Sequence, residues 1–284
     1  MPARKIRSII RSRPTLEGAG VRLKRVFGSS EVPRFDPFLL LDHFGSDDPE
    51  DYIKGFPWHP HRGIETVTYM IRGEVKHGDS IGNKGVIRSG DIQWMTAGSG
   101  IIHQEMPQPF KGNMVGFQLW VNLPKNRKMT DPRYMGITNK DIVRTSKDDA
   151  GINLIAGRIG GKKGPVHHLF VDVEYFDLHL SGNFEHKTEK KTVFVYVYEG
   201  SVEIEGKKVS AEHCALLEEK GDIKITGKAK FIFVAGNPLK EPVAWGGPIV
   251  MNTEKELEKA FQELDEGTFI KGKIPTNVAE DFYR

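Results

Sequence analysis

Only one cysteine, Cys214, occurs in the 284 residues, so no disulfide can form within the chain. The sequence also lacks an apolar stretch long enough for a signal peptide or a membrane span. With neither feature present, the cytoplasm is the default compartment, with the nucleus as an alternative if the source is eukaryotic. Because Cys214 precedes Ala-Leu-Leu in a strand-like setting, we expect it to be a buried structural residue.

An excess of charge of one sign is also missing. The 41 basic and 38 acidic residues leave a net charge of +3. Such a balanced surface lacks the basic face of a nucleic-acid-binding protein, and direct nucleic-acid binding is not expected. The one basic cluster is MPARKIRSIIRSRP, at residues 1–14. It could be an organelle presequence, since it is rich in Arg and free of acids. We favour a first strand, because Ile6, Ile9 and Ile10 provide little helical face.

Long helical patterns are scarce, whereas Gly (31 residues) and Pro (16 residues) are plentiful. This punctuation favours many short strands joined by turns. In the first half, β-branched and alternating patterns predict strands at 64–71, 92–96, 101–106 and 115–123. Between residues 124 and 151 the periodicity disappears, which is typical of a linker, and strand patterns then resume. We therefore expect an all-β protein with two domains, residues 1–137 and 138–284.

A weak internal repeat supports two copies of one β domain. Tyr196-Val-Tyr-Glu-Gly-Ser-Val-Glu-Ile resembles Tyr69-Met-Ile-Arg-Gly-Glu-Val-Lys-His, and both predict a strand, a turn glycine and a second strand. One helix is expected near the end. Thr253 and Glu256 have the spacing of a capping box, apolar residues follow with helical periodicity, and Gly267 is placed to end the helix.

Two pairs of polar residues carry the candidate chemistry. His59 and His61 stand at i and i+2, as do His103 and Glu105. Alternate residues of a strand face the same side, so each pair projects from one face. Three imidazoles and a carboxylate suit a borderline divalent metal such as iron, nickel, copper or zinc. The sequence therefore predicts one metal site inside the first β domain.

Residues 55–73 resemble the first cupin motif, with three residues in place of five between Gly55 and His59. The segments HPHRGIETVTY, GDIQWMTAGSGIIHQEMP and QLWVNLP resemble the pirin family more closely, and the likeness extends over nearly the whole chain. The resemblance implies two cupin β-barrels of the jelly-roll type, face to face, with a metal only in the N-terminal barrel. The terminal helix is assigned to the second barrel.

The resemblance also bears on the carboxylate ligand. The general cupin scheme would use Glu65, four residues after His61, and strand parity agrees with both glutamates, since 59, 61 and 65 share it. Pirins use the glutamate of the H-x-E pair, which is Glu105 here. We favour Glu105 and keep Glu65 as the alternative. Aligning Gly200 on Gly73 places His186 on His59 but offers no counterpart to the second pair, so the second barrel is expected to be metal-free.

What the resemblance implies about function is a quercetin 2,3-dioxygenase activity, in which O2 opens a flavonol ring and carbon monoxide is released. The metal, most of all Fe(II), with Ni, Cu, Mn, Co or Zn as alternatives, would polarise a small aromatic substrate. Glu105 would be both a ligand and the catalytic base. Phe56, Trp58, Trp94 and Met95 could form an apolar mouth for a flat ligand.

A second class of function also fits the resemblance. Some pirins are regulatory partners of transcription factors or of metabolic enzymes. A metal-dependent interaction protein without catalysis is therefore the alternative, with a protein partner in place of a substrate. No motif in the sequence separates the two.

Overall fold

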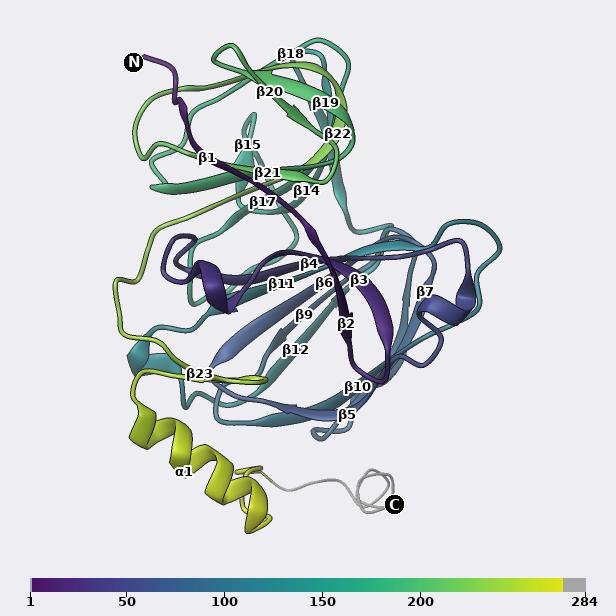
Figure 1. The fold of residues 1–284 in the computed structure, drawn as a ribbon, viewed down its shortest axis with the longest axis vertical. Coiled ribbons are helices and arrows are strands. Elements are labelled where there is room, and N and C mark those ends of the chain that lie inside the picture. The colour runs from purple at the N-terminus through teal and green to yellow at the C-terminus, as the bar shows by residue number, and fades with distance from the viewer. Residues whose placement is uncertain (1, 273–284) are drawn as a thin grey trace. The chain divides into compact units, whose positions relative to one another are not determined.

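The structure, a computed structural model, describes residues 2–272. Most of the described residues that have regular structure are in strands. These residues also include one α-helix, α1 (Glu254–Asp265), which is seen near the C-terminal end of the ribbon in Figure 1, and three short 3-10 helices, η1 (Ser29–Glu31), η2 (Pro49–Asp51) and η3 (Lys125–Arg127). The all-β prediction with a single late helix is confirmed.

Contacts divide the chain into two compact units. The N-terminal β unit contains residues 14–25, 39–139 and those from 240 on, and the C-terminal β unit contains residues up to 13, 26–38 and 140–239. Each unit is therefore built from segments that are far apart in the sequence.

The N-terminal β unit has two main sheets and a small hairpin near the C-terminal helix. Seven strands pair in one sheet, in the order β12 (Arg133–Ile137), β9 (Ile92–Thr96), β6 (Ile64–Arg72), β11 (Val115–Asn122), β4 (Phe38–Phe44), β3 (Val21–Phe27) and β2 (Arg13–Glu17). Four strands pair in the other, in the order β5 (Phe56–His61), β10 (Ile101–Pro107), β7 (Glu74–Asp79) and β8 (Lys84–Arg88). The strands expected at 64–71, 92–96, 101–106 and 115–123 are all present.

Apolar side chains from both of these sheets form a buried cluster. Val21, Tyr52, Met70, Val75 and Met114 belong to one buried cluster of this unit. Burial of this apolar area supplies the main favourable term that holds the two sheets. The polar residues that point inward are thus exceptions within an apolar interior, and each requires a partner.

The C-terminal β unit has one large sheet and a small hairpin. Its main strands run in the order β1 (Ile6–Arg11), β21 (His213–Leu217), β19 (Thr192–Ile204), β22 (Ile223–Gly236), β17 (Glu174–Leu180), β14 (Ala150–Ala156) and β13 (Val143–Lys147). Strand β18 (Asn183–His186) pairs with β22, β20 (Lys207–Ser210) pairs with β19, and β15 (Arg158–Ile159) pairs with β16 (Lys162–Lys163). Residues 6–11 form the predicted first strand, and Cys214 is buried as expected.

Two details of the expected organisation are wrong. Gly200 is not a turn, because β19 continues through it with a positive φ of 78° and a bulge between Val197 and Glu199. At the equivalent Gly73, the chain leaves β6 in one sheet and enters β7 in the other. The segment expected to be a linker does contain the boundary between the two units, at residues 139 and 140, but it is not irregular, because it contains β12 and β13, which pair with β9 and β14. Their short length and charged outward residues concealed the strand pattern.

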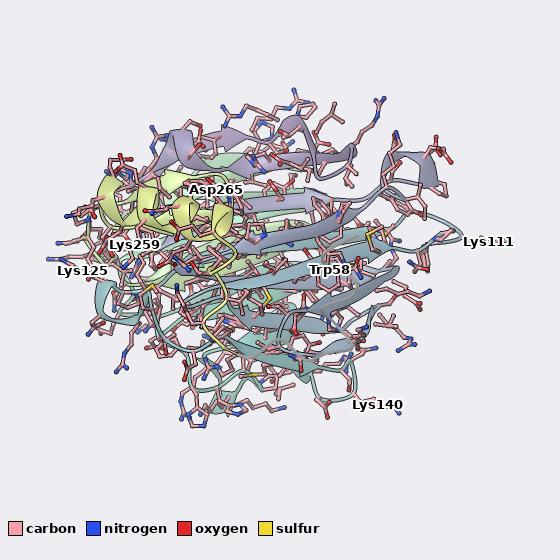
Figure 2. All side chains as sticks on the ribbon, turned by 90° about the horizontal axis from the view of Figure 1, so that it is seen from below. Trp58, Lys111, Lys125, Lys140, Lys259 and Asp265 are labelled. Atoms are coloured by element: carbon pink, nitrogen blue, oxygen red, sulfur yellow. The ribbon has the colours of Figure 1, made fainter. Side chains whose placement is uncertain are left out.

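The capping box of α1 is formed as predicted. The Glu256 amide donates to Thr253 Oγ1 at 3.2 Å, and the Thr253 amide donates to Glu256 Oε2 at 2.9 Å. Leu257 and Ala260 are buried, whereas Lys259 and Asp265 point outward from the other side of the helix (Figure 2). None of the helices in residues 2–272 has the length and apolarity needed to cross a bilayer.

The buried face of α1 decides which unit the helix joins. It packs with the hairpin of β23 (Ala244–Gly246) and β24 (Ile249–Met251) and with Ile102 of β10, all in the N-terminal β unit. The expectation that residues 138–284 form one barrel together with this helix is therefore corrected. The boundary between the units lies between residues 239 and 240, before the hairpin and the helix, so the helix does not belong to the same unit as the strands at 140–236.

Candidate metal centre

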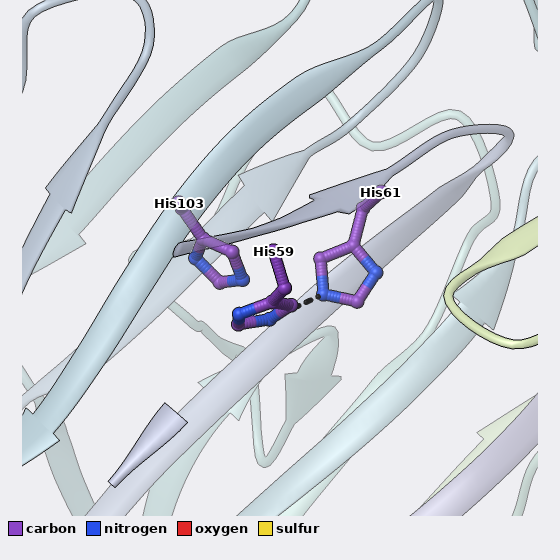
Figure 3. Close-up of side chains that lie close together, drawn as sticks. All are labelled: His59, His61 and His103. Atoms are coloured by element: carbon purple, nitrogen blue, oxygen red, sulfur yellow. Dashed lines mark hydrogen bonds between the residues drawn. The ribbon is translucent and has the colours of Figure 1, made fainter. Parts of the chain in front are cut away.

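Pairing of β5 with β10 brings the two histidine-containing segments together. The strands are antiparallel, with His103 opposite His59 and Ile101 opposite His61. Figure 3 shows the rings of His59 and His61 from β5 and His103 from β10 turned toward a common point. The candidate donor atoms of the three rings all lie within 4.8 Å of one another. The three histidines predicted from the sequence therefore form one cluster, which we call the histidine cluster.

Hydrogen bonds from the Nδ1 atoms of His59 and His61 determine which ring nitrogen carries the proton. His59 Nδ1 is 2.8 Å from the Pro57 carbonyl oxygen, and His61 Nδ1 is 3.1 Å from the Pro248 carbonyl oxygen. A carbonyl can only accept, so each Nδ1 carries the proton and donates. In neutral rings both Nε2 atoms then present lone pairs to the cluster. This tautomer is typical of metal-bound histidine.

The two Nε2 atoms of His59 and His61 are 3.1 Å apart. With both protons on Nδ1, this contact places two lone pairs opposite each other with no hydrogen between them. Ligands that each lie about 2.1 Å from one ion have a separation of this order. A bound cation would convert an unfavourable contact into two bonds.

His103 is the third histidine of the cluster. Both of its ring nitrogens are buried and have no hydrogen-bond partner among the described residues. Burial, followed by the nearby histidines, holds the pKa of His103 well below its usual value, and burial likewise lowers the pKa of His61. A neutral imidazole is the form that binds a metal. The unpaired nitrogens and the neutral rings together fit a transition-metal ion.

Glu105 lies next to the cluster on β10 but is not part of the group of donors within 4.8 Å. Its side chain is buried, and its two oxygens accept from different neighbours. Thr68 Oγ1 donates to Oε1 at 2.8 Å, and Gln118 Nε2 donates to Oε2 at 2.8 Å. Trp120 Nε1 donates to Gln118 Oε1 at 3.0 Å, and the Trp120 ring lies edge-on to His61 at 5.1 Å between centroids. Gln118 thus connects the carboxylate to a residue that contacts the cluster.

Glu65 lies on the opposite side of β6 from Thr68. The two residues are three positions apart in a strand that pairs regularly with β9, so their side chains face opposite ways. Glu65 Oε1 accepts from Thr96 Oγ1 at 2.7 Å and lies 3.7 Å from Arg133 Nη2. The parity argument for Glu65 is wrong, because Gly63, with a φ of 78°, separates β5 from β6 and the two strands belong to different sheets.

The expected aromatic mouth is only partly placed near the cluster. The Phe56 ring lies 6.5 Å from the His59 ring, between centroids. Trp94 is buried on the same face of the seven-stranded sheet as Glu65, since it pairs with Val67. A Cβ at Gly78 would lie 3.4 Å from the ring of Trp58, which is labelled in Figure 2, and Met95 is fully buried. Of the four expected residues we retain Phe56 as an aromatic contact of the site, beside Trp120, which was not expected.

Five contributors to the site were not predicted from the sequence: Thr68, Gln118, Trp120 and the carbonyls of Pro57 and Pro248. The first two had a detectable signal, since a polar residue at an inward position of an apolar strand often has a specific partner. The Pro248 carbonyl had none, because it lies 187 residues from the ring that it binds. In the C-terminal β unit, His186 Nε2 is bound to Glu174 Oε2 at 2.9 Å and packs against Phe176 and Phe233. The expectation that this barrel holds no metal stays a prediction.

The fold and the histidine cluster define a class of protein with two cupin domains, one of which has a cluster of histidines that could hold a metal. Residues 20–121 match the Pirin family, and residues 175–270 match the family described as Pirin C-terminal cupin domain. A Pseudomonas aeruginosa protein named "Putative quercetin 2,3-dioxygenase" is 42% identical over 269 residues, which cover 89% of this chain and 94% of that protein. The chain belongs to the pirin family.

Two further comparisons agree. Human pirin is 37% identical over 277 residues, which cover 92% of each chain. A crystal structure of quercetin 2,3-dioxygenase from Acinetobacter baumannii superposes with a TM-score of 0.87 at 34% identity, covering 96% of this chain and 100% of that one. The two-cupin fold expected from the resemblance is thereby confirmed.

Proposed function

We propose that this protein is a metal-dependent dioxygenase of the quercetin 2,3-dioxygenase type, acting on flavonol-like aromatic substrates. The observation that carries the proposal is the histidine cluster, in which the donor atoms of three imidazoles lie together, the buried His103 ring has both nitrogens unpaired, and the buried Glu105 carboxylate lies on the same strand. The names of the Pseudomonas aeruginosa relative and of the Acinetobacter baumannii structure support the choice of reaction.

His59, His61, His103 and Glu105 are the residues that we propose to hold the ion, and Fe(II) is the metal we propose. Nitrogen donors with one carboxylate also suit Ni, Cu, Mn, Co and Zn, so the donor set narrows the metal to this group. When bound, the metal would supply Lewis acidity toward a chelating substrate and, as iron, the capacity to react with O2. The cluster leaves no role for Glu65 as a ligand in this proposal.

Glu105 is the proposed catalytic residue. A flavonol must lose a hydroxyl proton to become reactive, and a carboxylate at the site can accept it. Thr68 and Gln118 each donate to one carboxylate oxygen, so each oxygen keeps a further lone pair for a ligand or a proton. These two bonds also fix the rotamer of Glu105, which limits the entropy lost when substrate binds.

The proposal is tested by oxygen uptake. Protein loaded with Fe(II) under anaerobic conditions should consume O2 when quercetin is added and release carbon monoxide in equal amount, because one ring carbon leaves as carbon monoxide for each O2 incorporated. A Glu199→Gln variant, which alters an exposed ion pair with Lys230 in the C-terminal β unit, should behave like the wild type.

A protein that binds iron fully but consumes no O2 with any flavonol would contradict the enzyme proposal. Metal-dependent binding of a protein partner would then support the regulatory alternative, in which the same site holds an ion without turnover.

A further inference from the structure

The hairpin β23–β24 reaches the histidine cluster from the far end of the chain. Pro248, in the turn between its two strands, provides the carbonyl that accepts from His61 Nδ1 at 3.1 Å. Trp245, on β23, lies 5.8 Å from Trp120 between ring centroids, and Trp120 in turn lies edge-on to His61. The hairpin therefore contacts His61 directly through a carbonyl and indirectly through an aromatic pair.

Backbone bonds attach the hairpin to the chain just after His61. The Val250 amide donates to the Arg62 carbonyl at 3.0 Å. Buried Lys128 donates from Nζ to the carbonyls of Val250 and Gly63, both at 2.9 Å, and so connects the two segments. A Cβ at Gly63 would lie 1.9 Å from the Val250 oxygen, so the close approach of the two backbones requires glycine at this position.

Arg62 also connects the end of β5 to α1 and to the residues that follow it. Its side chain is buried, and its Nη2 donates to the Phe269 carbonyl at 2.9 Å while its guanidinium lies 4.1 Å from the centre of the Phe269 ring. Its Nη1 lies 2.7 Å from Glu263 Oε2 on α1. We call residues 244–270 the C-terminal clasp, because they bind two consecutive residues, His61 at the end of β5 through the Pro248 carbonyl and Arg62 just after it through Val250, Glu263 and Phe269.

We propose that the C-terminal clasp positions His61 for metal binding, so that metal binding and docking of the clasp stabilise each other. The inference rests on the proposed metal site. The Pro248 carbonyl holds the His61 proton on Nδ1 and leaves Nε2 free to bind, but only while the clasp is docked. Loss of such an outer hydrogen bond typically weakens metal binding by about 10- to 100-fold. Thermodynamic reciprocity then requires the metal to stabilise the docked clasp by the same factor.

Amide hydrogen exchange of the wild-type protein tests the linkage without any mutation. Addition of Ni(II) to metal-free protein should slow exchange in residues 249–251 and in α1 by about tenfold or more, following the reciprocal factor. Exchange in β22 of the C-terminal β unit is the internal reference and should not change. Equal exchange rates in the clasp with and without bound Ni(II) would overturn the inference.

A variant that weakens the attachment of the C-terminal clasp tests whether metal affinity falls as a result. Lys128→Met removes the donor that connects Val250 to Gly63 and leaves every proposed ligand in place. We expect Ni(II) affinity to fall about tenfold and the His61 ring to populate both tautomers, seen in its 15N resonances. Lys147→Met is the matched control, because it removes a lysine bound to a carbonyl, that of Glu185, in the other unit.

The outcomes separate this inference from the metal site itself. If Lys128→Met binds Ni(II) as tightly as the wild type and its His61 ring keeps a single tautomer, the proposed role of the clasp is wrong, whereas the proposed metal site is unaffected. Failure of the wild type to bind Ni(II) would overturn both. If Lys128→Met does not fold, the exchange measurement on the wild type decides alone.

Discussion

Three polar side chains at the histidine cluster, those of His59, His61 and Glu105, are each oriented by a group that is not itself a proposed ligand. The carbonyls of Pro57 and Pro248 orient two imidazoles, and Thr68 and Gln118 orient Glu105. Directional bonds of this kind reduce the number of conformations that the ligands must lose on binding a metal. The site is thus largely preorganised by single residues.

Removal of one imidazole should abolish tight metal binding and leave the fold intact. For His61→Ala or His103→Ala we expect Ni(II) affinity, measured by titration calorimetry, to fall by more than about 100-fold, because a direct ligand contributes more than an outer hydrogen bond. Far-ultraviolet circular dichroism should stay that of a β protein, since pairing of β5 with β10 uses backbone groups. The control is His167→Ala, an exposed histidine outside the cluster. Wild-type affinity in both cluster variants would refute the site.

The two buried glutamates should respond differently to loss of charge. Glu105→Gln should weaken metal binding and eliminate dioxygenase turnover, because it removes the proposed ligand charge and the base. Glu65→Gln should be milder on both counts and should instead lower the free energy of unfolding, since Glu65 faces away and lies beside Arg133. Metal titration and chemical denaturation of both variants provide the comparison. If Glu65→Gln lost more metal than Glu105→Gln, the ligand would have to be reassigned to Glu65.

At the scale of elements, the helix α1 is attached to the N-terminal β unit chiefly by an ion pair and an apolar face. Glu263 on α1 lies 2.7 Å from both Arg62 Nη1 and Lys271 Nζ, beside the buried Leu257 and Ala260. A buried guanidinium without its partner carboxylate is costly, so the helix and the strand that precedes β6 depend on each other.

This ion pair predicts a pH dependence. Burial acts to raise the pKa of Glu263, but Lys271 and Arg62 outweigh it and leave the pKa below its ordinary value of 4.5. A lowered folded-state pKa means that the stabilisation is complete above 4.5 and disappears as the pH falls through the folded-state value. Glu263→Gln should therefore lower the free energy of unfolding at pH 7 by about 2 kcal/mol.

The difference between Glu263→Gln and the wild type should vanish in strong acid. Denaturation with urea across pH 2 to 7 measures it, with Glu258→Gln, an exposed position on the same helix, as the control. A gap that stayed constant down to pH 2 would show that the charge of Glu263 does not stabilise the fold.

At the scale of the whole molecule, the two units have the same kind of architecture but different interiors. The N-terminal β unit places histidines and a carboxylate inward, whereas the C-terminal β unit has a large apolar cluster that includes Phe176, Leu178, Val195 and Phe233. Two domains of one fold thus differ in the candidate ligands that their interiors present. Oxygen uptake by the iron-loaded protein distinguishes the enzyme from the regulator, since both would share the same metal site.

Local pattern in the sequence was sufficient for much of this description. Alternation along a strand is a short-range property, so the i, i+2 pairs at His59 and His103 could be recognised directly. The capping box of α1 and the strands β6, β9, β10 and β11 follow from the same kind of local information.

Only the tertiary structure decided which distant segments meet. The resemblance favoured Glu105 and kept Glu65 as the alternative, and strand parity did not separate them. The turn at Gly63 places β5 and β6 in different sheets, so the parity of Glu65 with the two histidines does not bring its side chain to their face. The unit to which α1 belongs, and the Pro248 carbonyl behind His61, depend on contacts across roughly 200 residues. No local periodicity encodes such contacts, because they arise when separate apolar faces are buried together.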